Sequence, residues 1–324
     1  MKSIINERNI KLWSTLGPRA SLGLGMLEII KENKNLMVIT SDVSTSAGLD
    51  RFRKQFPENY LDLGIAEQNM IGVAAGLASE DFDVVTTTFA PFQTMRCCEQ
   101  IKVNFGYMKH KVCMVGLASG LILGTLGFTH CCIEDIGALR SIPGICIISP
   151  SDSLETIKAL DQAVKSNKTI YLRLTGGSNN TIINKKDYKF EIGKSIQLRD
   201  GKDVTIISSG AIIDECLIAA ETLAKDDISV KIINMHTIKP IDKSAIEDAC
   251  MSKLIVTVEE HNIFGGLGSS VAEYKSSLAS STQLLMLGIN DNYSKGGSYS
   301  YLKDLHGISS EKIVKQIKIK LART

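Results

Sequence analysis

The chain has 324 residues, a length that favours two domains of ordinary size, and 44% of the residues are apolar. Its formal net charge of +2 creates no strong field, which argues against nucleic acid or an anionic membrane as the main partner, and no apolar run is long enough to predict a membrane span. The eight cysteines form no C-x-x-C pair and the first residues contain no apolar signal core, so we expect reduced thiols and a cytoplasmic location.

The first part of the chain alternates between helical and strand patterns. Residues 1–35 are predicted to be helical, with a break at Gly17-Pro18. Short apolar runs then predict strands at 36–40, 60–63, 84–89, 112–117, 145–149 and 169–174. The segments between these strands predict helices at 67–79, 92–106, 133–141 and 154–165. Nearly continuous Val, Ile and Leu runs between helices are typical of a parallel sheet that is covered on both faces.

A polar stretch at 176–189 interrupts this alternation and predicts a domain boundary, which we place after residue 188. The alternation then resumes, with strands predicted at 204–208, 230–235, 254–259 and 284–289 and helices at 213–224, 243–250, 269–280 and 310–320. The sequence therefore predicts an α/β fold with two doubly wound, mostly parallel sheets, one in residues 1–188 and a smaller one in residues 189–324.

Glu67 is the first candidate for a functional side chain. Open parallel sheets bind ligands at the carboxyl ends of their strands, and Glu67 follows a short predicted strand and begins the helix 67–79. The helix dipole alone also favours an acid in the first turn, so a purely structural role stays open. Gly72 and Gly76 each cost this helix about 0.8–1.0 kcal/mol relative to alanine, which suggests that another backbone or a flat ring approaches it closely.

The segment after the predicted strand 84–89 contains two aromatic residues and a cation. Phe89 and Phe92 could form a ring-stacking wall beside an anion-binding Arg96. Alternatively, both rings belong to the core and Arg96 pairs with a local acid such as Glu99.

Two further candidates follow other predicted strands. His130 ends a glycine-punctuated loop, where it could move a proton or donate a hydrogen bond, although a structural role is also open. Arg173 closes the apolar strand 169–174, and because a buried strand tolerates arginine only when it is paired, we expect it to emerge at the strand end, where it could hold an anion.

The second part of the chain contains one glycine-rich loop. Gly265-Gly-Leu-Gly268 follows a predicted strand and opens a helix as a phosphate loop would, but the dinucleotide pattern is incomplete and a close-packing turn is favoured. Glu259, Glu260 and His261 beside it are expected at an interface or on the surface.

These pieces, in their order, resemble the C-terminal half of the transketolase family. The similarity runs from about residue 10 to residue 280. It is carried by Leu63-Gly-Ile-Ala-Glu-Gln-Asn69, Thr88-Phe89 through Arg96, Glu99-Gln-Ile101, Gly127-x-Thr-His130, Leu139-Arg-x-Ile-Pro143, Pro150-x-Asp152, Arg173, Lys239-Pro240 and Val258-Glu-Glu-His-x-Ile-x-Gly-Gly-x-Gly268.

The resemblance implies a thiamine diphosphate enzyme, with residues 1–188 as its pyrimidine-binding domain and residues 189–324 as its C-terminal domain. The Gly-Asp-Gly motif with which the family's N-terminal domain holds the diphosphate through Mg²⁺ does not occur in this sequence. The resemblance thus implies the C-terminal subunit of a split transketolase. An N-terminal partner subunit would supply the Mg²⁺ ligands, no metal ligand is expected on this chain, and both chains would form a two-fold heterotetramer.

The resemblance also implies a role for each candidate residue. Glu67 would bind N1′ of the aminopyrimidine and take part in its proton transfer. The other candidates would contact the cofactor or a sugar-phosphate substrate: Ile65, Phe89 and Phe92 the pyrimidine, His130 the reacting oxygens, and Arg96 and Arg173 a phosphate or other anion.

Two positions depart from the family pattern. Leu126 stands where the family commonly carries the Asp that is associated with a sugar hydroxyl, and Cys131 replaces a Gln. We therefore expect substrates other than the standard pentose and heptose phosphates. Two alternatives to ketol transfer remain: a 2-oxo acid enzyme that resembles deoxyxylulose-phosphate synthase or the pyruvate dehydrogenase β subunit, and a non-catalytic partner subunit.

Overall fold

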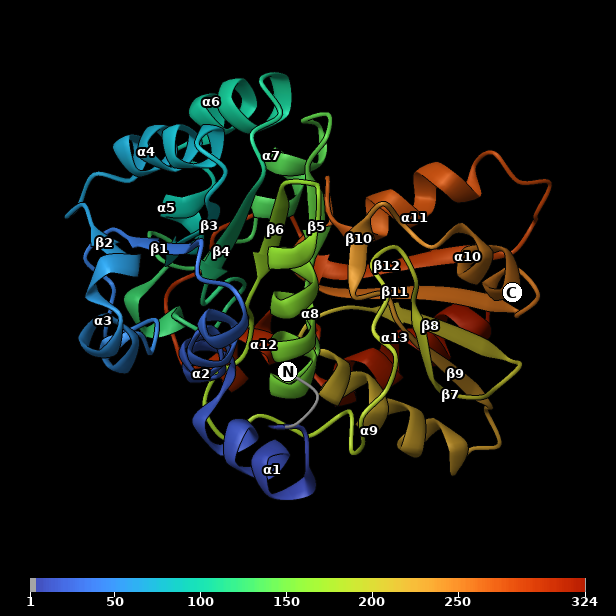
Figure 1. Cartoon of the computed structure of the whole chain (residues 1–324). Helices are drawn as coiled ribbons and strands as arrows, with labels where there is room; N and C mark the ends of the chain where they lie inside the picture. Colours follow the sequence, from blue (N-terminus) through green and yellow to red (C-terminus); the bar gives the residue numbers. More distant parts are fainter. Residues whose placement is uncertain (1–3, 324) are drawn as a thin grey trace.

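The computed structural model describes residues 4–323 and contains two sheets, each flanked by helices (Figure 1). The α/β class with mostly parallel sheets is therefore confirmed. Each sheet ends in one antiparallel edge strand, while the other pairings are parallel.

The first sheet has seven strands in the order β10-β5-β6-β4-β3-β1-β2. Its strands are β1 (Leu36–Thr40), β2 (Tyr60–Asp62), β3 (Asp83–Phe89), β4 (Val112–Leu117), β5 (Cys146–Ile148), β6 (Ile170–Arg173) and β10 (Thr237–Lys239). The inner strands β1, β4, β5 and β6 are buried along their whole length, which explains why they appear in the sequence as continuous apolar runs.

Helices cover both faces of the first sheet. Apolar side chains of α2, α3 and α8 form one core against it, and those of α4, α6 and α7 form another on the opposite face. The helices in this part are α1 (Glu7–Leu16), α2 (Pro18–Glu32), α3 (Asp50–Gln55), α4 (Glu67–Ser79), α5 (Ala90–Gln93), α6 (Cys98–Ile101), α7 (Asp135–Arg140) and α8 (Ser153–Lys165), with short η segments at Pro57–Asn59, Lys102–Tyr107 and Gly124–Leu126.

The second sheet has five strands in the order β12-β11-β8-β9-β7. Helices α10 and α11 continue the core on the α4 side of the first sheet, and α9 and α13 cover the other face. The elements are β7 (Ile196–Arg199), β8 (Val204–Ser208), β9 (Val230–Asn234), β11 (Leu254–Asn262), β12 (Gln283–Ile289), α9 (Ile213–Ala224), α10 (Lys243–Ala249), α11 (Leu267–Lys275), α12 (Tyr299–Leu305) and α13 (Ser310–Leu321).

The structure differs from the sequence-based expectation at 92–106. That segment is not one helix but α5, α6 and a π-helix at Lys102–Tyr107. The Thr94 hydroxyl donates to the Ala90 carbonyl at 2.7 Å, and the Arg96 amide donates to Pro91. The Thr94 amide keeps its ladder bond to Ala90, but the Arg96 amide bonds five residues back and the Phe92 carbonyl accepts the Cys97 thiol at 3.2 Å, so the regular ladder of α5 stops after one turn.

Several short elements were not predicted, namely β7, β10, α3 and α12. Strand β10 pairs antiparallel with β5, so the edge of the first sheet is formed by residues from beyond position 189. A three-residue strand leaves too little periodicity to be recognised in the sequence. The division of the chain after residue 188 stays a prediction.

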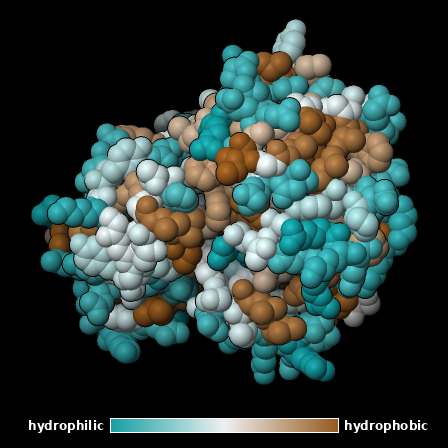
Figure 2. All heavy atoms as spheres, turned by 90° about the vertical axis from the view of Figure 1, so that its left-hand side faces the viewer, coloured by the Kyte–Doolittle hydropathy of each residue, from teal (hydrophilic) through white to brown (hydrophobic). Residues whose placement is uncertain are grey.

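Between residues 4 and 323 no helix combines the length and apolarity needed to cross a membrane. Figure 2 looks onto the side of the molecule that carries β2, α3 and α4, where apolar areas interrupt a polar surface.

Candidate active site

Glu67 lies at the first turn of α4, directly after the turn that joins this helix to β2. Gly64 in that turn has φ +67°, a conformation that favours glycine. Despite its place at a helix end, Glu67 is only 3% exposed. Its Oε1 atom accepts a hydrogen bond from Arg96 Nη1 at 2.8 Å, and Oε2 accepts none from the residues that the structure describes. The acid that pairs with Arg96 is therefore Glu67 and not Glu99.

An aromatic wall stands beside this ion pair. The Phe89 and Phe92 rings meet edge to face, with centroids 6.4 Å apart. The Arg96 guanidinium lies 4.2 Å from the Phe92 centroid, and the His130 ring lies 5.5 Å from Phe92 and 6.3 Å from Phe89. Five predicted site residues thus form one contiguous cluster, which we call the Glu67 cluster.

Sheet topology explains why these residues meet. β2, β1, β3 and β4 are neighbours and run parallel, so their carboxyl ends lie at one edge of the sheet. Glu67 follows β2, Phe89 ends β3, and His130 lies in the loop that follows β4. This edge is where open parallel sheets bind ligands.

Ile65 occupies the turn before Glu67 and is 77% exposed. Ile65 exposes much apolar surface to water next to a buried carboxylate. This rim is therefore a place where a ligand or another chain could bind and cover the isoleucine.

Arg173 does not join the Glu67 cluster. It is 2% exposed and does not emerge at the strand end, contrary to the sequence-based expectation. Its Nε atom donates to Asp135 Oδ2 at 2.8 Å, and Nη2 donates to the carbonyls of Glu260 at 2.8 Å and Cys132 at 3.4 Å. In this structure the guanidinium has no surface open to an anion.

The partner of Arg173 was missed in the sequence, although a buried arginine requires one. Asp135 also accepts a hydrogen bond from the Tyr171 hydroxyl at 2.7 Å. Burial alone would raise the pKa of Asp135, but the Arg173 charge and the hydrogen bonds outweigh burial and lower it. Asp135 therefore stays ionised, and the pair fastens α7 to β6.

The acidic run at the end of β11 is buried, so its expected place at an interface or on the surface is wrong. Glu259 Oε2 accepts the Leu267 amide at 2.7 Å and Oε1 accepts the Gly268 amide at 2.8 Å. The glycine-rich loop thus binds a carboxylate of its own chain, and a Cβ at Gly266 would lie 2.1 Å from Glu259 Oε2. The close-packing interpretation of this loop accounts for the contacts.

The two cysteines after His130 are free thiols and are buried. Burial, together with nearby carboxylates, raises the pKa of Cys131 to about 11, and burial raises that of Cys132 well above its ordinary value. Neither thiol is activated as a nucleophile. The chemistry available at this edge is therefore the proton transfer and ligand binding that the side chains of the Glu67 cluster can perform.

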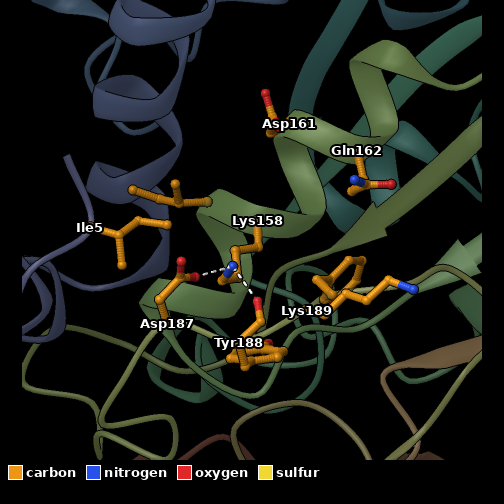
Figure 3. Close-up of a pocket in the computed structure, with 9 residues that line it drawn as sticks. Ile5, Lys158, Asp161, Gln162, Asp187, Tyr188 and Lys189 are labelled. Carbon is orange, nitrogen blue, oxygen red and sulfur yellow. Dashed lines mark hydrogen bonds and ion pairs between the residues drawn. The ribbon is translucent and has the colours of Figure 1, made fainter. Parts of the chain in front are cut away.

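A cavity of about 510 Å³ lies elsewhere, between α8 and the segment 187–190. The Lys158 ammonium in its wall donates to the Tyr188 carbonyl and pairs with Asp187 (Figure 3). None of the lining residues belongs to the Glu67 cluster, and the two other charged lining residues, Asp161 and Lys189, pair with Lys165 and Glu191 outside the wall, so we assign this cavity no part in the chemistry.

Within residues 4–323 no group of three or more His, Cys, Asp and Glu side chains is arranged to hold a metal ion.

Comparison with known proteins gives two matches along the chain, to the pyrimidine-binding domain of transketolase over residues 15–180 and to the transketolase C-terminal domain over residues 193–313. A putative transketolase C-terminal section of Methanocaldococcus jannaschii is 37% identical over 302 residues, which are 93% of this chain and 95% of the relative. A 6-deoxy-6-sulfo-D-fructose transketolase subunit of a Clostridium species is 34% identical over 291 residues, 90% of both chains. A solved split-gene transketolase, an inactive β4 tetramer, is 30% identical with a TM-score of 0.85, and the similarity covers 95% of this chain and 98% of that one.

Proposed function

The chain belongs to the transketolase family, and on this premise we propose that it is the C-terminal subunit of a two-component, thiamine diphosphate-dependent transketolase. In this proposal the assembled enzyme transfers a two-carbon ketol unit from a ketose or ketose phosphate to an aldose. The observation that carries the proposal is the buried Glu67 carboxylate, which faces a cation and an aromatic wall at the carboxyl edge of the first sheet.

The residues present fit an aminopyrimidine ring. Glu67 Oε2 is not used by any donor in the described part of the chain and can bind a ring nitrogen, while Phe89 and Phe92 supply flat apolar surface. Ile65, exposed at the rim, would cover part of the ring. When bound, thiamine diphosphate supplies the carbon nucleophile and stores the electron pair of the ketol unit.

This chain's own contribution is proton transfer and orientation. Glu67 would share a proton with the pyrimidine nitrogen. Arg96, fixed by Glu67 and by the Phe92 face, keeps that carboxylate in place and has the charge to meet a substrate anion. His130 is held at Nδ1 by the Thr129 hydroxyl at 3.0 Å, which leaves Nε2 to contact reacting oxygens. Arg173 would act only through Asp135, by fixing α7.

The partner chain completes the site in this proposal. The relatives named above include a transketolase C-terminal section and a split-gene transketolase, which supports a separate N-terminal subunit. In this proposal that subunit holds the diphosphate and Mg²⁺. The proposed assembly is a two-fold heterotetramer in the cytoplasm. Each active site would lie between the Glu67 cluster of this chain and the partner.

The proposed substrates are sugars other than the common pentose and heptose phosphates. Leu126 is exposed, with its apolar side chain four residues before His130, at the position where the family commonly has Asp. A leucine cannot accept a hydrogen bond from a sugar hydroxyl. The relative that acts on a sulfo-sugar supports non-standard substrates within this subfamily. A 2-oxo acid donor is the alternative, and pyruvate decarboxylation by the assembled pair would favour it.

Glu67→Gln tests the proposal in the pair reconstituted with the N-terminal subunit. Ketol transfer should fall by roughly 10²–10⁴-fold, the usual contribution of a positioned acid–base group, and thiamine diphosphate should bind more weakly. Glu99→Gln, on the exposed surface of α6, is the control and should keep the parent rate. A Glu67→Gln pair as active as the parent would contradict catalysis at Glu67 and favour a non-catalytic partner subunit.

A further inference from the structure

We propose that residues 291–306 position the loop that carries His130, with Tyr299 as the positioning residue. We call residues 121–131 the histidine loop and residues 291–306 the C-terminal brace. The importance of His130 rests on the function proposed above, whereas the contacts between loop and brace stand on the structure alone.

The base of the histidine loop is tied to the second sheet. Gly120 and Cys132 close it by a pair of backbone hydrogen bonds of 2.9 and 3.1 Å. Just inside this pair, the Leu121 amide donates to Glu260 Oε2 at 3.1 Å, and the Tyr299 hydroxyl donates to Glu260 Oε1 at 2.6 Å. Because Glu260 is buried, the carboxylate depends on these donors for its solvation, and removing either one is costly.

The middle of the loop lies against the brace backbone. The Gly297 amide donates to the Gly124 carbonyl at 3.0 Å. A Cβ at Gly124 would lie 2.3 Å from Leu302 Cδ1, and a Cβ at Gly296 would lie 2.7 Å from the Gly124 carbonyl oxygen. Glycine on both sides allows an approach that side chains would prevent.

The far side of the loop is held by aromatic groups. The Phe128 ring lies 5.4 Å from the Tyr293 ring and 6.1 Å from His306. The Tyr293 hydroxyl also donates to Glu134 Oε1 at 2.7 Å, just beyond the end of the loop. The brace therefore contacts the loop at its base, its middle and its side.

The tip of the loop faces the other way. His130 contacts the rings of Phe89 and Phe92, which belong to the first sheet. The loop thus spans from the brace to the Glu67 cluster. The second half of the chain, which supplies no member of that cluster, acts on the site by fixing where His130 stands.

Tyr299→Phe is the decisive variant because it removes one hydroxyl and keeps the ring. Tyr301→Phe is the matched control: it lies on the same helix, is 53% exposed, and its hydroxyl makes no hydrogen bond to the described residues. Hydrogen exchange is measured on the chain alone. Amides of residues 121–131 should exchange roughly tenfold faster in Tyr299→Phe and at the parent rate in Tyr301→Phe, as expected when a hydrogen bond to a buried carboxylate is lost.

Kinetics of the reconstituted pair supply the second measurement. In Tyr299→Phe, kcat should fall about five- to tenfold and its pH profile should shift, because His130 is displaced, while the affinity for thiamine diphosphate stays at the parent value. Tyr293→Phe removes a second contact from a more exposed position and should change loop exchange and kcat in the same direction.

Three results would overturn the positioning role. They are parent-like exchange in residues 121–131, faster exchange spread evenly over the second half of the chain, and faster loop exchange with an unchanged kcat. If the parent pair shows no ketol transfer, the proposed function fails, and the exchange experiment still decides whether the brace holds the loop.

Discussion

The ion pair between Arg173 and Asp135 can be tested by removing one of its two charges. Arg173 Nε lies 2.8 Å from Asp135 Oδ2, and the two side chains are 2% and 0% exposed. Arg173→Met keeps much of the volume and removes the charge, which leaves Asp135 buried and unpaired. Removing one partner of a buried ion pair costs about 3–5 kcal/mol.

Thermal unfolding of the isolated chain measures this cost. A loss of that size should lower Tm by roughly 4–7 °C, because an unfolding entropy of about 2.1 cal/mol/K per residue over 324 residues gives about 1.5 °C per kcal/mol. Arg53→Met is the control: Arg53 pairs with Asp50 at 3.0 Å, but the two side chains are 44% and 38% exposed, so the loss of this pair should cost about 1 kcal/mol or less. The double variant Arg173→Met/Asp135→Leu should recover most of the stability, since apolar residues can replace a buried pair.

The sign of the pH dependence follows from Asp135. Its pKa is lowered in the folded chain, so its contribution to stability is present above its ordinary value of 3.8 and is lost as the pH falls through the folded value. The Tm difference between parent and Arg173→Met should therefore shrink in acid. An Arg173→Met chain with the parent Tm, whose reconstituted pair had a raised KM for anionic substrates, would refute our assignment and support the anion-binding role.

Two further predictions concern other buried or open positions. Burial lowers the pKa of His261 to about 4, so its contribution to stability is complete above about pH 6.5 and is lost toward pH 4. Between pH 7 and 5 the free energy of unfolding of the parent in urea should fall by about 2 kcal/mol more than that of His261→Gln. An equal fall in both chains would contradict this. Gly76 on α4 has open space around it, so Gly76→Ala should stabilise the isolated chain by roughly 0.8–1.0 kcal/mol, and it should weaken assembly, measured by sedimentation, if a partner packs closely on this helix. An unchanged Tm together with unchanged assembly would show that neither helix propensity nor close packing governs this position.

Much of the fold could be predicted because its signals are local. The continuous apolar runs of β1, β4 and β8 are recognisable in the sequence, and α4 and α9 have the predicted bounds. Strand β10 could not be predicted because its three residues become a strand only by pairing with β5, far away in the chain. The break after α5 depends on which carbonyl the Arg96 amide reaches, which no periodicity reveals.

The candidate site divides in the same way. Glu67, Phe89 and His130 could be singled out because each follows a predicted parallel strand, and the structure places them together. The partners of buried charges could not be identified, since Arg173 meets Asp135 and Glu260 meets Tyr299 only after distant segments have packed. The catalytic roles of Glu67 and His130 are proposals that the variants above can test.

The sequence alone determined the α/β class, the order of the longer strands and helices, and three of the residues that meet at the strand ends, because these depend on short-range periodicity and on which residue types can carry chemistry. Only the tertiary structure decided that Arg96 pairs with Glu67, that Arg173 is enclosed, and that the second half of the chain holds the loop of His130. Charge pairing and loop support depend on distances between segments that are far apart in the chain, and packing alone sets those distances.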